Sequence, residues 1–136
     1  MEKVQIDPSE QIARNWVTWL DALASGDYKK TINRLHSTVD GEERHCCLGV
    51  AQICLGLSQT DGASDERLVQ MLGFNDSQGF NIAKGIYITT LNDREHYSDI
   101  DFANMHRELL ADLEAFTPKH PEVAPLVRKM LAERNA

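Results

Sequence analysis

The sequence predicts an α-rich α+β domain in which four to five helices surround a small antiparallel β-sheet or hairpin. Two observations lead to this class. Large apolar residues recur at helical spacing near both ends of the chain, whereas β-branched residues, aromatic residues and a turn signal gather between them. The 136 residues are a usual length for one domain, so we expect residues 1–136 to fold as a single globular unit.

A helix is expected to open the fold. The segment Asp7-Pro8-Ser9-Glu10 offers an acidic N-cap, a proline at the first helical position and a glutamate placed to close a capping box. Ser25-Gly26 ends the helix, because glycine readily adopts the left-handed conformation of a helix cap. One face carries five large apolar residues: Ile12, Trp16, Trp19, Leu20 and Leu23. We expect both tryptophans to pack in the core rather than to stack on a ligand.

A short β-hairpin and a buried helix should follow. Residues 31–39 alternate loosely between apolar and polar side chains, Asp40-Gly41 is a turn signal, and Arg44-His45 begins a return strand. Residues 46–57 are apolar but too rich in small side chains for a strand. We predict a buried helix there, in which Gly49 lets a neighbouring segment approach closely and Gly56 lies near the end.

The carboxyl-terminal half should be mostly helical. Ser64 is placed to cap a short helix that Gly73 ends. Residues 75–85, rich in asparagine and glycine, should form an exposed loop, and residues 86–90 are the best strand candidate because β-branched and aromatic residues cluster there. A long helix is expected from residue 98 or 99 to Phe116, and a final helix opens at Pro121.

The charge and the amino terminus narrow the classes of function. With 21 acidic and 14 basic residues the formal net charge is −7, which disfavours binding to nucleic acid. An acidic surface keeps a protein in solution, and it also suits a basic partner. The first six residues lack the features of a signal peptide, and no apolar run reaches ~18 residues. We therefore expect a cytoplasmic protein without membrane contact, whose three cysteines are reduced thiols.

Four short motifs occur in a fixed order. They are Trp19-Leu20-Asp21-Ala22-Leu23-Ala24-Ser25-Gly26-Asp27-Tyr28, Cys46-Cys47-Leu48-Gly49-Val50, Leu72-Gly73 and Thr90-Leu91-Asn92-Asp93. In this the chain resembles a family of small, uncharacterised proteins encoded by bacteriophages and prophages. The likeness extends over roughly residues 16–110 and departs after Asp93, where the family has a serine-phenylalanine pair. The resemblance implies an accessory protein that acts on host defence or on host enzymes, in the cytoplasm of a bacterial host.

The cysteine pair admits three interpretations. The first is two small apolar side chains packed where space is tight. The second is catalysis: a cysteine at the start of a helix has a lowered pKa, and a histidine and a polar residue would complete a triad. The third is a metal site, which the spacing disfavours because no CxxC or HxxxH occurs. The residues concerned in catalysis are Cys46 or Cys47 as nucleophile, His45, His96 or His106 as base, and Asn92 or Asp93 as the third member. We expect packing, with no metal and no cofactor.

A polar segment at residues 92–96 is a second candidate region. It suits a turn that caps the following helix, and it also suits a surface that binds another molecule. The candidate binding residues are Asn92, Asp93, Arg94, Tyr97 and Tyr87. Tyr87, Arg94 and Tyr97 are also the contacts we would expect in a pocket that sequesters a nucleotide or a similar small molecule. Sequence patterns that cradle phosphate groups are missing.

These observations favour non-catalytic binding to a host macromolecule, namely a host protein or protein complex, with inhibition of a host defence system as one form of it. Two alternatives stay open: a cysteine-dependent hydrolase or transferase, and a protein that sequesters a small molecule. The sequence leaves the oligomeric state undetermined.

Overall fold

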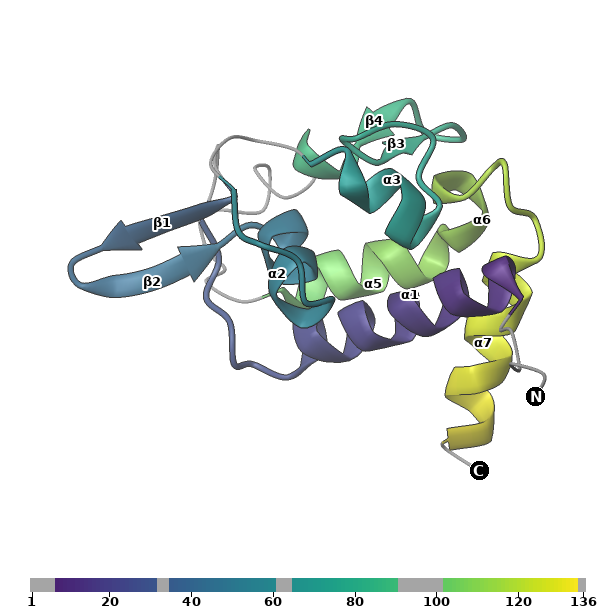
Figure 1. The fold of residues 1–136 in the computed structure, drawn as a ribbon, viewed down its shortest axis with the longest axis horizontal. Coiled ribbons are helices and arrows are strands. Elements are labelled where there is room, and N and C mark those ends of the chain that lie inside the picture. Colours follow the sequence, from purple (N-terminus) through teal and green to yellow (C-terminus); the bar gives the residue numbers. More distant parts are fainter. Residues whose placement is uncertain (1–6, 32–34, 61–64, 91–101, 135–136) are drawn as a thin grey trace, which may run out of the picture.

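The computed structural model describes residues 7–31, 35–60, 65–90 and 102–134. It confirms the α-rich α+β class: helices pack around a long first helix, and two small antiparallel sheets lie at the periphery (Figure 1). A single apolar cluster draws side chains from helices in both halves of the chain. None of the described helices combines the length and the apolar character needed to cross a bilayer.

Helix α1 (Pro8–Ala24) runs along the molecule as predicted. The Asp7 carboxylate accepts the backbone N–H of Ser9 at 2.9 Å, which caps the helix with its own N-cap residue. At the other end the chain turns through Gly26, whose φ is +80°. All five residues of the predicted apolar face are buried, the most exposed at 7 %.

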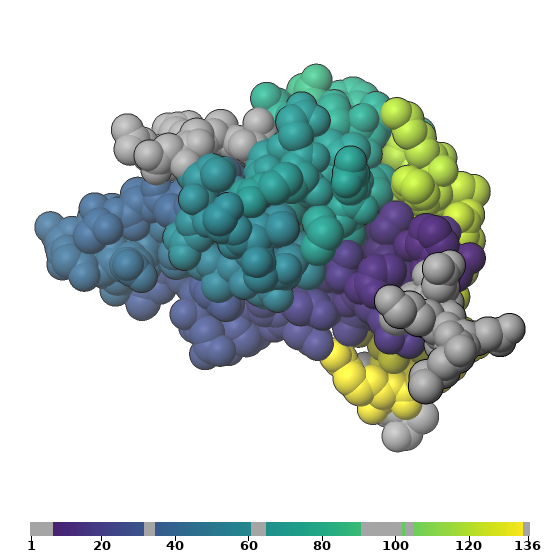
Figure 2. All heavy atoms as spheres, viewed as in Figure 1, coloured from purple at the N-terminus to yellow at the C-terminus, as the bar shows by residue number. Residues whose placement is uncertain are grey.

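The predicted hairpin is present, although pairing starts later than residue 31. Strand β1 (His36–Val39) pairs antiparallel with β2 (Glu42–His45), and Asp40 and Gly41 form the turn with φ of +53° and +78°. A two-residue turn with positive φ at both positions matches the twist of the paired strands. The hairpin stands out from the helical body at the end opposite α7 (Figure 1, Figure 2).

Helices α2 (Cys47–Cys54) and α3 (Arg67–Leu72) follow the hairpin. The predicted role of Gly49 is confirmed, because a Cβ atom at that position would lie 2.1 Å from the carbonyl oxygen of Leu35. Helix α3 ends at Gly73 with φ of +70°, as expected. Its predicted cap Ser64 lies outside the described residues, and Asp65 instead accepts the backbone N–H of Arg67 at 2.9 Å.

The two tryptophans tie these helices to α1. Both side chains are fully buried, with ring centroids 5.1 Å apart in an edge-to-face arrangement. The Trp16 indole N–H donates to the Leu72 carbonyl at 2.6 Å, at the end of α3, and that of Trp19 donates to the Cys47 carbonyl at 2.8 Å, at the start of α2. Their core role is confirmed.

Residues 75–90 differ from the prediction. The segment predicted as an exposed loop contains strand β3 (Phe80–Asn81), which pairs with β4 (Ile86–Tyr87), and Asn81 is fully buried. Its side-chain oxygen accepts two backbone N–H groups, and its amide donates to Asp112 at 3.2 Å, so a distant carboxylate makes burial possible. The strand predicted for residues 86–90 was wrong beyond Tyr87, because residues 88–90 are helical.

The carboxyl-terminal helices are shorter than predicted. Within the described residues the long helix is divided into α5 (Ala103–Ala111) and α6 (Leu113–Phe116), with Asp112 outside helical geometry at φ −116° and ψ +29°. The final helix α7 (Val123–Arg134) begins two residues after Pro121 and packs against α1. Its buried residues are Val123, Ala124 and Val127.

Candidate functional site

The cysteine pair lies at the junction of the hairpin and α2. Cys46 is the N-cap residue, and its Sγ accepts the backbone N–H of Gly49 at 3.4 Å. The catalytic alternative requires a thiol at the amino end of a helix, and Cys46 is placed there. Its side chain is only 5 % exposed, however, and Cys47 is fully buried. Both thiols are therefore packed in the core, which agrees with the packing interpretation.

Of the other residues predicted for catalysis, the structure describes His45, which immediately precedes Cys46, and His106, whereas Asn92 and Asp93 lie outside the described residues. Cys54 is half-buried near the end of α2, and burial raises the pKa of its thiol to about 11. His106 is half-buried on α5, where burial lowers its pKa, and it makes no hydrogen bond to a cysteine within the described part of the chain. His96 lies outside the described residues.

Most of the predicted binding residues also fall outside the described residues: Asn92, Asp93, Arg94 and Tyr97. They stay predictions. Tyr87 is described, on strand β4, with 38 % of its side chain exposed and its ring 4.8 Å from that of Phe80. Ile82, in the β3–β4 turn, is the most exposed large apolar residue among those described, at 55 %.

The structure brings together two histidines that the sequence motifs do not pair. His36 and His45 face each other across the base of the hairpin, and their Nδ1 atoms are 2.8 Å apart. Pairs alternate along an antiparallel ladder between those joined by backbone hydrogen bonds and those that are not. Counting from the turn, His36 and His45 form a pair without backbone hydrogen bonds between them, so the N–H and C=O groups of His45 point away from β1. The backbone N–H of His45 donates to the Lys29 carbonyl at 2.7 Å, and the His45 carbonyl accepts the N–H of Thr31 at 2.9 Å. These two bonds anchor the hairpin.

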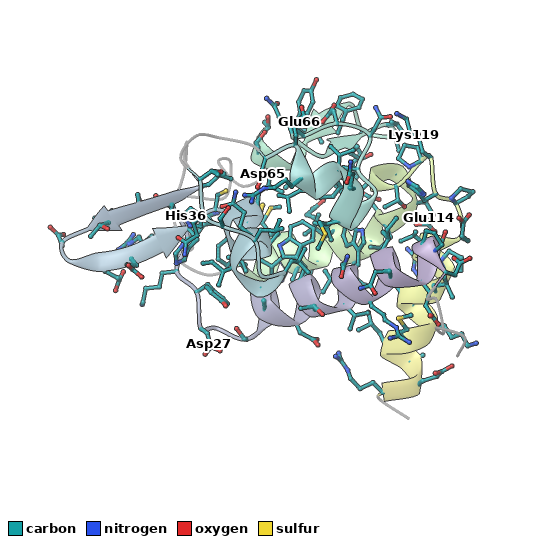
Figure 3. The ribbon with its side chains drawn as sticks, viewed as in Figure 1. Asp27, His36, Asp65, Glu66, Glu114 and Lys119 are labelled. Carbon is teal, nitrogen blue, oxygen red and sulfur yellow. The ribbon has the colours of Figure 1, made fainter. Side chains whose placement is uncertain are left out.

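The imidazole of His36 forms a hydrogen bond with Gln52 on the side facing away from His45. Its Nε2 lies 2.7 Å from the Gln52 Oε1 atom, and Gln52 Nε2 donates to the Asp65 carboxylate at 2.7 Å and to the Thr60 hydroxyl at 2.8 Å. Gln52 is fully buried on α2. Asp65 in turn accepts from three nitrogen donors of Arg67, its backbone N–H and the Nε and Nη2 of its guanidinium. A chain of hydrogen bonds therefore connects the Asp65–Arg67 ion pair, through Gln52, to His36 at the base of the hairpin. Figure 3 labels His36 and Asp65, at the two ends of this chain.

This chain determines which nitrogen carries each proton. The guanidinium of Arg67 holds the pKa of Asp65 at about 2, so its carboxylate is ionised at neutral pH and only accepts. The Gln52 amide nitrogen must face it, and the amide oxygen must face His36. When His36 carries a single proton, that proton lies on Nε2 and its Nδ1 accepts. As a result, His45 donates from Nδ1 and keeps a lone pair on Nε2.

An open polar hollow of about 220 Å³ lies on this side of the hairpin. Its walls are His36, Ser37, Thr38, Glu43, His45 and Gln59. Burial lowers the pKa of His45, the nearby His36 lowers it further, and the charge of Glu43 opposes both. The ring of Tyr28 covers His45 edge to face, with centroids 5.8 Å apart. The hollow therefore contains a hydrogen-bonded histidine pair, in which the lowered pKa of His45 favours its neutral form, beside one carboxylate.

The arrangement provides hydrogen-bond acceptors and a negative charge. Cys46 and Cys47 are not among the lining residues of the hollow and are buried in the core. Within the described ranges, no group of three or more histidine, cysteine, aspartate or glutamate side chains has the geometry to hold a metal ion. We therefore treat this hollow, which we call the two-histidine pocket, as the candidate site.

The sequence contains a signal for this pair in the spacing around the hairpin turn. A two-residue turn places residues in register when they are equally distant from it. His36 stands four residues before Asp40 and His45 four residues after Gly41, so the turn alone pairs them. Gln52 and Asp65 could not be placed in the same way, because their contacts depend on the packing of α2 against the hairpin and the loop before α3.

The chain matches no protein-family model, no curated protein and no solved structure.

Proposed function

We propose that this chain is a phage- or prophage-type accessory protein that acts in the host bacterial cytoplasm by binding a host protein without catalysis. Inhibition of a host defence system is one form that such binding takes. The sequence motifs support the setting, and the net charge of −7 disfavours a nucleic-acid partner. The observation that carries the proposal is the projecting hairpin β1–β2, which is the element that we propose contacts the partner.

The hairpin suits this role because it combines exposure with a rigid base. Thr38, Val39 and the turn are exposed, and the strands stand clear of the helical body (Figure 2). At the base, the backbone of His45 pairs with residues 29–31, and the His36 ring is bonded both to buried Gln52 and to the His45 ring. A preorganised element loses little conformational freedom on binding, which favours affinity.

The two alternatives receive less support. A cysteine-dependent enzyme needs a thiol that a substrate can reach, whereas Cys46 and Cys47 are 5 % and 0 % exposed. Sequestration of a nucleotide needs a pocket of roughly 300–1,000 Å³. The two-histidine pocket, at about 220 Å³, is smaller than that range, and Arg94 and Tyr97, two of the contacts expected for a nucleotide, lie outside the described residues. The pocket accommodates an end group of a larger partner better than a whole small molecule.

The proposal can be tested with two matched variants. Val39 in the hairpin and Ile82 in the β3–β4 turn are both exposed, at 40 % and 55 %, so an aspartate at either position should leave folding intact. The tagged wild-type protein, Val39→Asp and Ile82→Asp would each be used to capture partners from lysate of the bacterial host at moderate salt.

We expect one dominant protein to be retained by the wild type and by Ile82→Asp but lost with Val39→Asp. The opposite pattern would assign the contact to the surface around Tyr87, where the sequence placed its candidates. If no protein is enriched by the wild type, the binding proposal itself is wrong. Circular dichroism of all three proteins controls for folding.

A further inference from the structure

We infer that the two-histidine pocket is a binding site for a cationic hydrogen-bond donor, the guanidinium or ammonium group of a basic side chain on the partner. The inference rests on the proposed function, because it names the chemical group that a hairpin-bound partner would present. It is argued from the protonation of the histidines, the charge that lines the pocket and the size of the hollow.

The pocket offers a hydrogen-bond acceptor of defined position. The chain of bonds from Asp65 through Gln52 and His36 leaves the lone pair of His45 on Nε2. Within the described residues this atom has no hydrogen-bond partner, yet it is not sealed from solvent. The hydrogen bonds from Asp65 through Gln52 and His36 therefore select the His45 tautomer whose Nε2 is an acceptor. A donor group on a ligand would give this nitrogen a hydrogen-bond partner.

The charge of the pocket favours a cation. Residues alternate between the two faces of a strand, so Glu43 lies on the same face as His45, and Thr38, opposite it in register, lies on the face of His36. Glu43 is exposed and forms no ion pair with the described residues. Its neighbour Glu42, on the other face, is paired with Arg44 at 3.0 Å and Lys29 at 3.8 Å. The pocket face thus carries the carboxylate that is available to an external cation.

The size of the pocket suits the end of one side chain. A volume of about 220 Å³ corresponds to roughly seven water molecules at their share of about 30 Å³ each in the liquid. That space suits a guanidinium or ammonium group with part of its alkyl chain. An anion would meet the Glu43 carboxylate and the lone pair of His45, so phosphate or carboxylate ligands are disfavoured.

Protonation of His45 would oppose such a ligand. The groups around its ring are Glu43 and His36 on the hairpin, Tyr28 against its face, and the ion pair Asp65–Arg67 behind Gln52. Buried Lys30 pairs with His45 along the backbone but does not line the pocket. A proton on Nε2 of His45 removes the acceptor and adds a like charge, so binding should weaken as the pH falls.

The test uses the whole purified protein and three small probes. Methylguanidinium is the cationic donor, tetramethylammonium is a cation without N–H groups, and inorganic phosphate is the anion. Proton and nitrogen NMR of the His45 ring at neutral pH should show unprotonated Nε2 and a saturable shift with methylguanidinium, with a dissociation constant on the order of millimolar. Tetramethylammonium and phosphate should give no saturable shift.

Two variants make the test specific. Glu43→Gln should weaken methylguanidinium binding about fivefold, the effect of one exposed ion pair, whereas Glu42→Gln removes the same charge from the opposite face and should change it less than about twofold. Equal effects of the two variants, a stronger response to phosphate, or no saturable shift with methylguanidinium would each overturn the inference.

The same variants separate this inference from the proposed function. If Glu43→Gln retains the host partner as well as the wild type does while Val39→Asp loses it, the hairpin binds the partner and the pocket takes no basic group. If the wild type captures no partner but binds methylguanidinium, the pocket stands and the partner proposal fails.

Discussion

Gln52 connects the chemistry of the hairpin to the interior of the protein. Its amide nitrogen faces the ionised Asp65 carboxylate, so its oxygen can only face His36, and the protonation of both histidines follows. An asparagine or glutamine on an apolar helix gives no sign of such a role in the sequence. The role depends on the packing of α2 between the hairpin and the loop that precedes α3.

The histidine network predicts two separate steps in the stability of the protein at acid pH. Burial lowers the pKa of His45 below the usual value, so the unfolded chain takes up a proton first, and stability should fall as the pH drops below about 6.5. Burial also lowers the pKa of His106, so this residue contributes to the same loss of stability. Asp65, with a pKa of about 2, stabilises the folded state above about pH 4, and about 2 kcal/mol is lost as the pH falls toward 2.

These steps can be measured as urea unfolding midpoints between about pH 8 and pH 2. The variant Asp65→Asn should show a smaller lower step, to which Glu114 and Glu122 with their lowered pKa values also contribute, and should keep the upper step. A wild-type protein whose stability is constant between about pH 7 and pH 5 would contradict the neutral, buried state that we assign to His45.

The cysteines allow a test of the catalytic alternative. With its pKa raised from 9.0 to about 11, the Cys54 thiol should be alkylated by iodoacetamide at about pH 7.5 roughly a hundredfold more slowly than a free model cysteine. Cys46 and Cys47 should be protected by burial until the protein is unfolded in urea. Peptide mapping after timed labelling identifies each site, and any thiol that reacts as fast as a free cysteine would restore the enzyme alternative.

At the level of elements, the hairpin and α2 meet through one close contact. The carbonyl oxygen of Leu35 accepts the N–H of Cys46 at 3.0 Å, and the same oxygen lies where a Cβ of residue 49 would be. The glycine of the CCLGV motif therefore lets the helix begin directly beneath the strand. Both the need for glycine and the buried helix were predictable, because small residues in an apolar helix indicate close approach.

Replacing this glycine should cost more than replacing a glycine needed only for its backbone conformation. Gly49→Ala forces the Leu35 carbonyl to move and should lower the free energy of unfolding by about 3 kcal/mol. Gly41→Ala has open space around the new methyl group, and its positive φ should cost about 1 kcal/mol. Urea unfolding of both variants is the measurement. Equal losses would mean that the contact with Leu35 is not tight.

The elements that local sequence patterns misplaced share a physical cause. Asn81 and Asp112 favour turns by propensity, yet they bond to each other at 3.2 Å. Asn81 is the buried residue of strand β3, and Asp112 is the break between α5 and α6. Because the two residues are 31 positions apart, local patterns predicted an exposed loop and an uninterrupted helix. Tertiary bonding overrode both.

For the whole molecule, α1 is the centre of the core. It contacts α2, α3, α5 and α7, and its two tryptophans bond to the backbone of α2 and to the end of α3. Helix α7 packs along it at the end away from the hairpin (Figure 1). The last helix lies outside the four ordered sequence motifs but is part of the same apolar cluster, so the fold includes residues beyond those motifs.

The apolar contact of α7, rather than its surface ion pair, should hold the helix in place. Val127 is fully buried, and Val127→Ala should destabilise the protein by about 2 kcal/mol. Arg134 bonds Asp21 on α1, but both side chains are about half exposed, so Arg134→Ala should cost less than about 0.5 kcal/mol. Thermal unfolding compares the two. A larger effect of the arginine variant would show that electrostatics, not burial, docks the final helix.

The sequence by itself determined the fold class, the first helix and its buried face, the hairpin turn, and the need for glycine at position 49, because each depends on neighbours within a few residues. Only the tertiary structure decided what surrounds the cysteine pair and where a site is formed. The thiols are buried at the start of α2, which packs against α1, α3 and β2, and the tautomers of the two histidines depend on Gln52 and Asp65 through contacts that no local pattern records.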